Sequence, residues 1–176
     1  QAHVCGASMG GMIAQHLAAM APERVASLTL MMTTSGSRRL PQPSWRVRRA
    51  LMSRPMKPGA DAAVDWIIQV LYLIGSPIYP SDHQVLRARA LESVQRAWHP
   101  SGSARQLLAV VADGDRSTLL PHIQAPTLVI HGVDDPLVPV ACGKDLAQRI
   151  ADARADFIPG MGHDLPEELL PRFAQG

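Results

Sequence analysis

Two kinds of hydrophobic pattern alternate along the chain. Short runs that predict strands occur at His3–Cys5, Val25–Met32, Ala125–Gly132 and Ala155–Ile158. Val25–Met32 is nearly continuously apolar, which is typical of a parallel strand that is buried on both faces. Between the first two runs, Gly10–Met20 has apolar residues at helical spacing. A strand, a helix and a strand of this length predict a βαβ unit with parallel strands and a right-handed crossover.

The first predicted helix contains four large apolar side chains, which we expect on its buried side. They are Met12, Ile13, Leu17 and Met20. Pro22-Glu23-Arg24 end this helix, because proline cannot continue the helical hydrogen bonds. Near the end of the chain, helices are expected over Pro139–Ile150 and from Pro166, since proline is tolerated at an early helical position.

Three further helices are predicted in the middle of the chain. The first covers Asp61–Ile74, where apolar residues recur at helical spacing. The second starts after Ser81-Asp82, a good N-cap, and runs to about Trp98. Pro100 is expected to stop it, and Ser101-Gly102-Ser103 then start the third helix.

The predicted elements divide the chain into three sections. Residues 1–34 and 114–176 contain all the predicted strands, whereas residues 35–113 have helical patterns only. This order predicts an α/β fold with a mostly parallel sheet and a helical insertion between two strands. Within the insertion, Gly36–Pro58 has no acidic residue, and we interpret it as solvated surface in preference to a mobile basic flap. Its basic residues are Arg38, Arg39, Arg46, Arg48, Arg49, Arg54 and Lys57.

Composition and charge narrow the classes of function. A chain of 176 residues fits one domain with a substantial core. Its net charge of +2 is too small to indicate a nucleic-acid partner. No apolar run approaches the roughly 18 residues of a membrane helix, so no membrane partner is expected. The two cysteines, Cys5 and Cys142, do not form a disulfide framework, and we expect Cys5 to be a reduced thiol in a buried strand.

The start of the chain bears on its location and completeness. No signal peptide is visible, so the cytoplasm is the default expectation. Gln1 lies inside a predicted strand, however, and we expect an upstream segment or a targeting signal to precede it.

One short motif has the form of a sharp turn between a strand and a helix. Gly6-Ala7-Ser8-Met9-Gly10 gives G-x-S-x-G spacing between the first strand and the first helix. In such an elbow, the serine is held in a strained conformation, and glycines on either side let strand and helix approach closely. The hydroxyl of Ser8 would then stand above the sheet beside the first amides of the helix. The alternative is a glycine-rich turn that opens a buried helix.

Two other predicted strands are followed by residues that could act with Ser8. Asp134 and Asp135 follow the third strand, and His163 follows the fourth. The carboxyl ends of parallel strands meet at one edge of the sheet, where ligands bind. A serine hydroxyl needs an adjacent base to become a nucleophile, and a carboxylate can orient a histidine for that purpose. The order Ser, acid, His along the chain therefore predicts a catalytic triad.

These motifs together resemble the α/β-hydrolase superfamily. The elbow, the segment His131–Pro139 and the loop Pro159–His163 carry the resemblance, which covers nearly the whole chain. The closest similarity is to its cofactor-independent esterases of the aclacinomycin-methylesterase type. The resemblance implies that the helical insertion corresponds to the family's lid, and that the chain hydrolyses carboxylic esters of small apolar substrates through an acyl-enzyme.

The resemblance also assigns roles to individual residues. Ser8 matches the nucleophile, His163 the general base, and the backbone N–H of Met9 one donor of the oxyanion hole. Asp135, the aspartate before proline, matches the acid, with Asp134 as the second candidate. The aspartate that is not the triad acid would cap the next helix.

Several other polar and aromatic residues have a structural interpretation. We expect Asp164 to cap the last helix and His131 to belong to the core or to support the site. His99 is expected at the surface, although it could point into the pocket. Trp66 and Trp98 could line an apolar pocket, but packing within the lid is the preferred interpretation. The histidines and acids lack metal-ligand spacing, so neither a metal nor a cofactor is implied.

The resemblance also shows what would be missing. Members of the superfamily have several strands and a second oxyanion donor before the elbow, so the resemblance implies an α/β-hydrolase fold whose N-terminal strands are missing from this sequence. The elbow strand would then leave an open sheet edge, which is an aggregation hazard. We therefore expect a missing upstream segment or a second chain to cover this edge. The alternative function is that of a catalytically incomplete fragment or pseudoenzyme that binds a small molecule or a protein.

Overall fold

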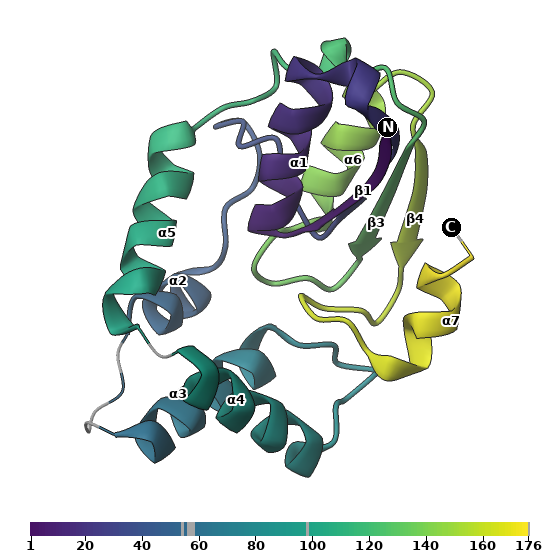
Figure 1. Cartoon of the computed structure of the whole chain (residues 1–176). Helices are drawn as coiled ribbons and strands as arrows, with labels where there is room; N and C mark the ends of the chain where they lie inside the picture. The colour runs from purple at the N-terminus through teal and green to yellow at the C-terminus, as the bar shows by residue number, and fades with distance from the viewer. Residues whose placement is uncertain (54, 56–58, 98, 176) are drawn as a thin grey trace.

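Four parallel strands form the centre of the molecule, as the apolar runs predict. The computed structural model describes residues 1–53, 55, 59–97 and 99–175. The strands are β1 (Ala2–Ala7), β2 (Val25–Met31), β3 (Thr127–Gly132) and β4 (Arg154–Ile158), and they lie in the order β1-β2-β3-β4. Each neighbouring pair is parallel. All carboxyl ends therefore lie along one edge of the sheet (Figure 1).

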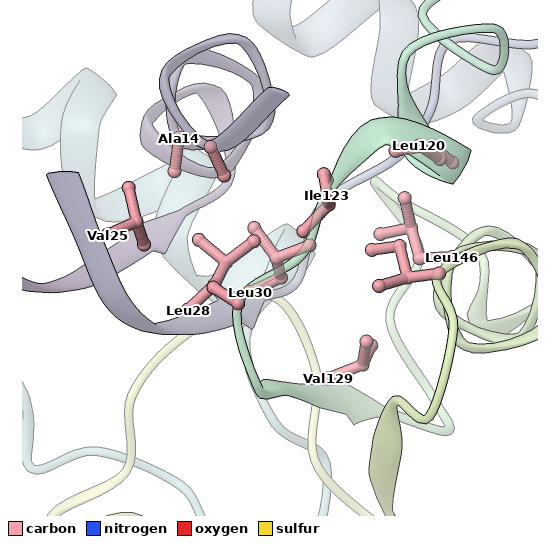
Figure 2. Close-up of a cluster of buried hydrophobic side chains, with 11 residues drawn as sticks. Ala14, Val25, Leu28, Leu30, Leu120, Ile123, Val129 and Leu146 are labelled. Carbon is pink, nitrogen blue, oxygen red and sulfur yellow. The ribbon is translucent and has the colours of Figure 1, made fainter. Parts of the chain in front are cut away.

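Two helices cover one face of the sheet. They are α1 (Met9–Met20) and α6 (Val140–Arg149) (Figure 1). The short 3-10 turn η1 (Pro22–Arg24) follows α1, and the 3-10 turn η2 (Leu120–His122) precedes β3. Side chains from these helices, from η2 and from the central strands form the main hydrophobic core (Figure 2). Its buried members include Ala14, Ala18, Val25, Leu28, Leu30, Leu120, Ile123, Val129 and Leu146.

Residues near the end of the chain cover the opposite face of the sheet. The predicted last helix begins as the 3-10 turn η3 (Glu167–Leu169) and continues as α7 (Leu170–Phe173). Leu169 and Phe173 pack with apolar side chains of β2, β3 and β4. The two faces of the sheet therefore have separate hydrophobic clusters.

The buried side of α1 differs from the prediction. Of the four large apolar residues expected inside, only Met12 is buried, while Ile13, Leu17 and Met20 are 61%, 42% and 77% exposed. The face that meets the sheet consists mainly of small residues, and Gln15 is buried among them. Small side chains let the helix axis lie close to the strands, so the larger ones turn outward.

The helices between β2 and β3 are α2 (Trp45–Met52), α3 (Ala60–Ile74), α4 (His83–Ala97) and α5 (Pro100–Asp113). Helices α3 and α4 lie beyond the carboxyl ends of the strands (Figure 1). They share a small core of their own, formed by Ala63, Val64, Ile68, Ala90 and Val94. The described part of the chain contains no helix long and apolar enough to cross a membrane.

The ends of these helices follow the predicted signals in part. The carboxylate of Asp82 accepts hydrogen bonds from the amides of Gln84 and Val85, at 2.8 and 3.0 Å, which confirms the predicted N-cap of α4. Pro100 was expected only to stop a helix, but it is the first residue of α5. Proline is tolerated there because the first amide of a helix has no partner within the helix. The predicted end of α4 at Trp98 lies outside the described residues.

The arginines that the structure describes in the basic segment are exposed. Five of its arginines lie at the surface, which agrees with the interpretation as solvated surface; they are Arg38, Arg39, Arg46, Arg48 and Arg49. Arg54 and Lys57 lie outside the described residues. Helix α2 begins at an N-cap in which Ser44 Oγ accepts from the amide of Val47 at 3.4 Å.

The start and the end of the helical insertion meet at a buried arginine. The amide of Arg116 donates to the carbonyl of Ser35 at 2.7 Å. Its guanidinium donates to the carbonyls of Thr34 and Gly114, at 3.0 and 3.1 Å, and to the carboxylate of Asp113. Arg116 is only 2% exposed. One side chain therefore ties together the two connections that join the insertion to the sheet.

The environment of Cys5 differs from the prediction. The expectation of a thiol in a buried strand is wrong for Cys5, which is exposed. The reason is that β1 lies at the edge of the four-stranded sheet and pairs only with β2. Its thiol lies 3.8 Å from the sulfur of Met31. Cys142, in contrast, is buried in α6, and burial raises the pKa of its thiol.

Candidate active site

Ser8 occupies a sharp turn between β1 and α1. Its φ of 51° and ψ of −119° lie in a region that residues with a side chain rarely adopt. Four hydrogen bonds hold this conformation. The amide of Ser8 donates to the carbonyl of Met31 at 2.8 Å. The carbonyl of Ser8 accepts from the amides of Gly11 and Met12, at 3.0 and 3.2 Å, and from the Thr33 hydroxyl at 2.7 Å.

Two glycines make this turn sterically possible, but they are not the pair of the G-x-S-x-G pattern. A Cβ at Gly6 would collide with the backbone of Gly10, and a Cβ at Gly11 would lie 2.6 Å from Thr33 Cγ2. A Cβ at Gly10 would meet no heavy atom within 4 Å. The close approach of strand and helix therefore requires Gly6 and Gly11, whereas Gly10 has room for a side chain.

The side chain of His163 lies within hydrogen-bond distance of both Ser8 and Asp135. His163 Nε2 is 3.0 Å from Ser8 Oγ, and His163 Nδ1 is 2.7 Å from Asp135 Oδ2. A neutral imidazole that donates from Nδ1 to the carboxylate leaves Nε2 free to accept the serine proton. The side chain of Asp135 is fully buried and that of His163 is nearly so. This geometry can deprotonate a serine hydroxyl as it attacks a carbonyl carbon.

The loop after β3 gives its two aspartates different contacts. Asp135 Oδ1 accepts from the amides of Leu137 and Val138, both at 2.8 Å, which leaves Oδ2 for His163. Asp134 points elsewhere: its Oδ2 accepts from the amide of Gly160 at 2.7 Å. The expectation that the second aspartate caps the following helix is wrong, because α6 has no side-chain cap and Asp134 holds the loop that precedes His163.

His131 lies buried behind Asp135, in agreement with its predicted place in the core. Its Nε2 is 2.8 Å from the carbonyl of Val138 and 3.7 Å from Asp135 Oδ2. Its Nδ1 has no hydrogen-bond partner among the described residues. Burial lowers the pKa of His131, although the carbonyl of Val138 and the charge of Asp135 act in the opposite direction. A neutral ring that donates from Nε2 satisfies Val138 and leaves Nδ1 as an unpaired acceptor.

The amide of Met9 lies at the start of α1, directly after Ser8. The amides of Gly11 and Met12 bond to the carbonyl of Ser8, and the described residues offer no acceptor for the Met9 amide. A free amide at a helix N-terminus can stabilise negative charge. This position is therefore suited to an oxyanion beside Ser8.

Asp164 does not act as predicted. It was expected to cap the last helix, but η3 has no side-chain cap, and Asp164 Oδ1 accepts from the hydroxyl of Ser76. Ser76 follows α3, so the contact joins the helical insertion to the loop that contains His163. The sequence reasoning missed Ser76, because neither its spacing nor its neighbours indicate a contact so far along the chain.

Two of the remaining candidates lie in the part of the chain that the structure describes. His99 is exposed, as expected. Trp66 Nε1 donates to Ser53 Oγ at 2.9 Å, so its ring joins α3 to the end of α2. Trp98 lies outside the described residues. Within the described ranges, no three histidine, cysteine, aspartate or glutamate side chains are grouped so that they could hold a metal ion.

A parallel sheet with a serine elbow after one strand, an acidic loop after another and a histidine loop after the last is the architecture of the α/β-hydrolase superfamily. Sequence comparison agrees with this class. Residues 1–169 match the family described as serine aminopeptidase, S33, and the chain belongs to that family.

Individual relatives include methyl ester hydrolases. The chain is 29% identical over 163 residues to a pimeloyl-acyl-carrier-protein methyl ester esterase of Chromobacterium violaceum, covering 92% of this chain and 63% of that protein. It is 30% identical over 186 residues to the rhodomycin D methylesterase DauP of a Streptomyces species, covering 94% of this chain and 61% of that protein. This chain therefore spans just over three fifths of the length of both relatives.

A solved structure agrees with the fold. A mutant of the meta-cleavage product hydrolase of Pseudomonas fluorescens gives a TM-score of 0.73 at 20% sequence identity, covering 99% of this chain and 62% of that one. At this identity, the similarity supports the arrangement of sheet and helices and carries no information on the substrate.

Proposed function

We propose that this chain contains the catalytic triad of a serine hydrolase that cleaves carboxylic esters of small apolar substrates. The observation that carries the proposal is the position of His163, 3.0 Å from Ser8 Oγ and 2.7 Å from Asp135 Oδ2. The positive φ of Ser8 supports it, because a strained conformation persists where the surrounding structure enforces it. The names of the two methyl ester hydrolases support an ester as the substrate.

In the proposed acylation step, Ser8 Oγ attacks the ester carbonyl while its proton passes to His163 Nε2. The imidazolium that forms is stabilised by the buried carboxylate of Asp135, which remains ionised throughout. His163 then donates this proton to the departing alkoxide. The products of this half-reaction are an alcohol and an ester of Ser8.

Deacylation repeats the same proton transfers with water as the nucleophile. His163 Nε2 accepts a proton from water, the hydroxide adds to the acyl carbon, and the proton returns to Ser8 Oγ as the acid leaves. Both half-reactions pass through a tetrahedral oxyanion, for which the free amide of Met9 is one donor. Loss of one such donor costs on the order of 10² to 10³ in rate, so a second donor from outside the described residues would strongly affect turnover.

Covalent labelling tests the nucleophile directly. We expect a fluorophosphonate to label the wild-type chain once, at Ser8, and p-nitrophenyl acetate or butyrate to be hydrolysed with a loss of at least about 10³-fold in Ser8→Ala. Peptide mapping identifies the labelled residue. Labelling at another residue, or undiminished labelling of Ser8→Ala, contradicts the proposal. Analysis of the products separates ester cleavage from the cleavage of amides or carbon–carbon bonds.

The second candidate function is a binding module without turnover, and the open edge of β1 favours it. β1 pairs only with β2, and Ala2, His3 and Cys5 are exposed along it. We propose that further chain of the same protein, or a partner chain, covers this edge. Solution mass and ester hydrolysis discriminate between the two functions. A stable dimer that fails to hydrolyse p-nitrophenyl esters and is not labelled at Ser8 favours the binding module.

A cytoplasmic location also remains a prediction. Fractionation of cells that express the natural gene, followed by detection with an antibody against this chain, tests it. Recovery in the periplasm or in the medium contradicts it.

A further inference from the structure

The loop that contains His163 is bound to the helical insertion by backbone hydrogen bonds. The amide of His163 donates to the carbonyl of Ile74, the last residue of α3, at 2.7 Å. The amide of Ile78 donates to the carbonyl of Gly160 at 3.3 Å. Residues 74–78 and 160–164 therefore lie side by side, although the two bonded pairs are 89 and 82 positions apart along the chain.

Glycines on both sides make this contact close. A Cβ at Gly162 would collide with the carbonyl oxygen of Gly75, and a Cβ at Gly160 would lie 2.6 Å from the Cβ of Ile78. A Cβ at Gly75 would lie 3.3 Å from Asp164 Oδ2. The two segments thus meet backbone to backbone, and neither can shift far without breaking a hydrogen bond.

Ser76 connects the two segments through its side chain. Its hydroxyl accepts from the amide of Gly162 at 2.9 Å and donates to the carboxylate of Asp164. Gly162 and Asp164 are the residues on either side of His163. Ser76 is buried, so each of these hydrogen bonds is made away from bulk water. A single hydroxyl therefore holds the chain immediately before and immediately after the histidine.

We propose that Ser76 and Asp164 are positioning residues for His163. They fix the loop from the side of the helical insertion, while Asp134 holds Gly160 from the side of β3. Held from both sides, the imidazole of His163 keeps its place between Ser8 and Asp135. This inference rests on the proposed function of His163 as the general base. It gives the helical insertion a part in catalysis.

Positioning and stability can be separated experimentally. A hollow of about 70 Å³ is bordered by Gly75, Ser76 and Asp164, which is room for a water molecule. In Ser76→Ala, water can solvate the carboxylate of Asp164, which limits the loss of folding stability. Such a water is not bonded covalently to residue 76, so the loop loses its side-chain attachment to the insertion and keeps only the backbone bonds to Ile74 and Ile78.

The test compares four variants of the full chain. Each rate is divided by the fraction of active sites that a fluorophosphonate titrates, so that misfolded protein does not lower the measured kcat. We expect Ser76→Ala and Asp164→Ala each to lower kcat about 10- to 100-fold with little change in KM, since small misplacements of catalytic groups cost this much. Asp164→Asn keeps an oxygen acceptor for the Ser76 hydroxyl and should restore kcat to within about threefold of the wild type. Ser81 lies in the same connection between α3 and α4 and borders the same hollow, but it makes no hydrogen bond to residues 160–164. Ser81→Ala is therefore the matched control and should leave kcat unchanged.

A second readout does not depend on catalysis. Amide hydrogen exchange at Gly162 and His163 should become at least about tenfold faster in Ser76→Ala, because both amides donate to the 74–76 segment. Unchanged exchange, or faster exchange with an unchanged normalised kcat, overturns the positioning role. An unreactive Ser8 in the wild-type chain contradicts the proposed function instead, and the exchange measurement still decides whether Ser76 holds the loop.

Discussion

Asp135 Oδ2 lies 2.7 Å from His163 Nδ1, whereas the carboxylate of Asp134, the preceding residue, contacts the amide of Gly160 at the same distance. Two adjacent carboxylates thus hold the histidine in different ways. One contacts its ring, and the other contacts the backbone of its loop. Their substitution should therefore have different effects.

Asp135→Asn should lower kcat about 10⁴-fold, because an amide can no longer stabilise the imidazolium and can favour the wrong tautomer of His163. Asp134→Asn keeps an oxygen that can accept from Gly160, so we expect a loss of less than about tenfold. Steady-state hydrolysis of a p-nitrophenyl ester by both variants checks this difference. Equal losses, or a larger loss in Asp134→Asn, would show that the acid has been assigned to the wrong aspartate.

The elbow glycines provide a second prediction. Gly6→Ala and Gly11→Ala should each destabilise the chain by about 2 kcal/mol or more, since the new methyl groups collide with the backbone of Gly10 and with Thr33. Gly10→Ala should change the free energy of unfolding by less than about 1 kcal/mol, and in the stabilising direction, because alanine favours the helix and the site is open. Urea denaturation measures all three. A large loss in Gly10→Ala would mean that the motif constrains this position for a reason other than space.

His131 should make the stability of the chain sensitive to acid. In the folded state the pKa of His131 is lowered from its ordinary value of 6.5, mainly by burial. The bond to Val138 and the charge of Asp135 raise this pKa, and the nearby His163 lowers it. Below pH 6.5, His131 therefore binds a proton more readily in the unfolded chain than in the folded one. The stability that neutral His131 contributes is present above that pH and is lost as the pH falls. Between pH 7.5 and 5.5 the free energy of unfolding should decrease by about 1 kcal/mol for this reason.

The variant His131→Gln isolates this effect. Glutamine can still donate to the carbonyl of Val138 but does not titrate. The difference in unfolding free energy between wild type and variant should therefore shrink by about 1 kcal/mol as the pH falls from 7.5 to 5.5. Urea titrations at the two pH values measure it. A difference that is independent of pH would show that His131 takes up its proton equally in both states.

The sequence predicts the strands and the three converging side chains because both depend on short-range signals. Apolar runs mark β2, β3 and β4, and Ser8, Asp135 and His163 each follow a strand, where parallel topology brings distant residues to one edge. Local pattern and chain order are sufficient for these features.

Features that depend on packing partners are not predicted from pattern alone. The periodicity of α1 predicts a helix, but the residue volumes needed at the sheet decide that Ala14 and Ala18 face inward and Ile13 outward. The hydrogen bond from Ser76 to Asp164 joins positions 88 residues apart, and no local pattern indicates it. The role of Asp164 was therefore assigned to the nearest helix, which was wrong.

Arg116 should be a main determinant of stability at the junction of insertion and sheet. It is 2% exposed, and its guanidinium donates to the carbonyls of Thr34 and Gly114 and to Gln15 Oε1. In Arg116→Met, buried Gln15 Oε1 and the half-buried carbonyl of Gly114 lose a donor, and the carbonyl of Thr34 keeps only the bond from Gln15 Nε2. The apolar part of the side chain keeps its volume. Because each unsatisfied buried group costs about 1–3 kcal/mol, we expect a total loss on the order of 3 kcal/mol.

Two further variants test whether this loss comes from the hydrogen bonds. Arg116→Lys keeps the charge beside Asp113 but cannot reach all three acceptors, so its loss should lie between those of the wild type and Arg116→Met. Arg105→Met, at an exposed position of α5, is the matched control and should change the unfolding free energy by less than about 0.5 kcal/mol. Urea denaturation at pH 7 measures all three variants. If Arg116→Met were no less stable than Arg105→Met, the junction would be held by its backbone contacts, such as the 2.7 Å bond from the Arg116 amide to Ser35.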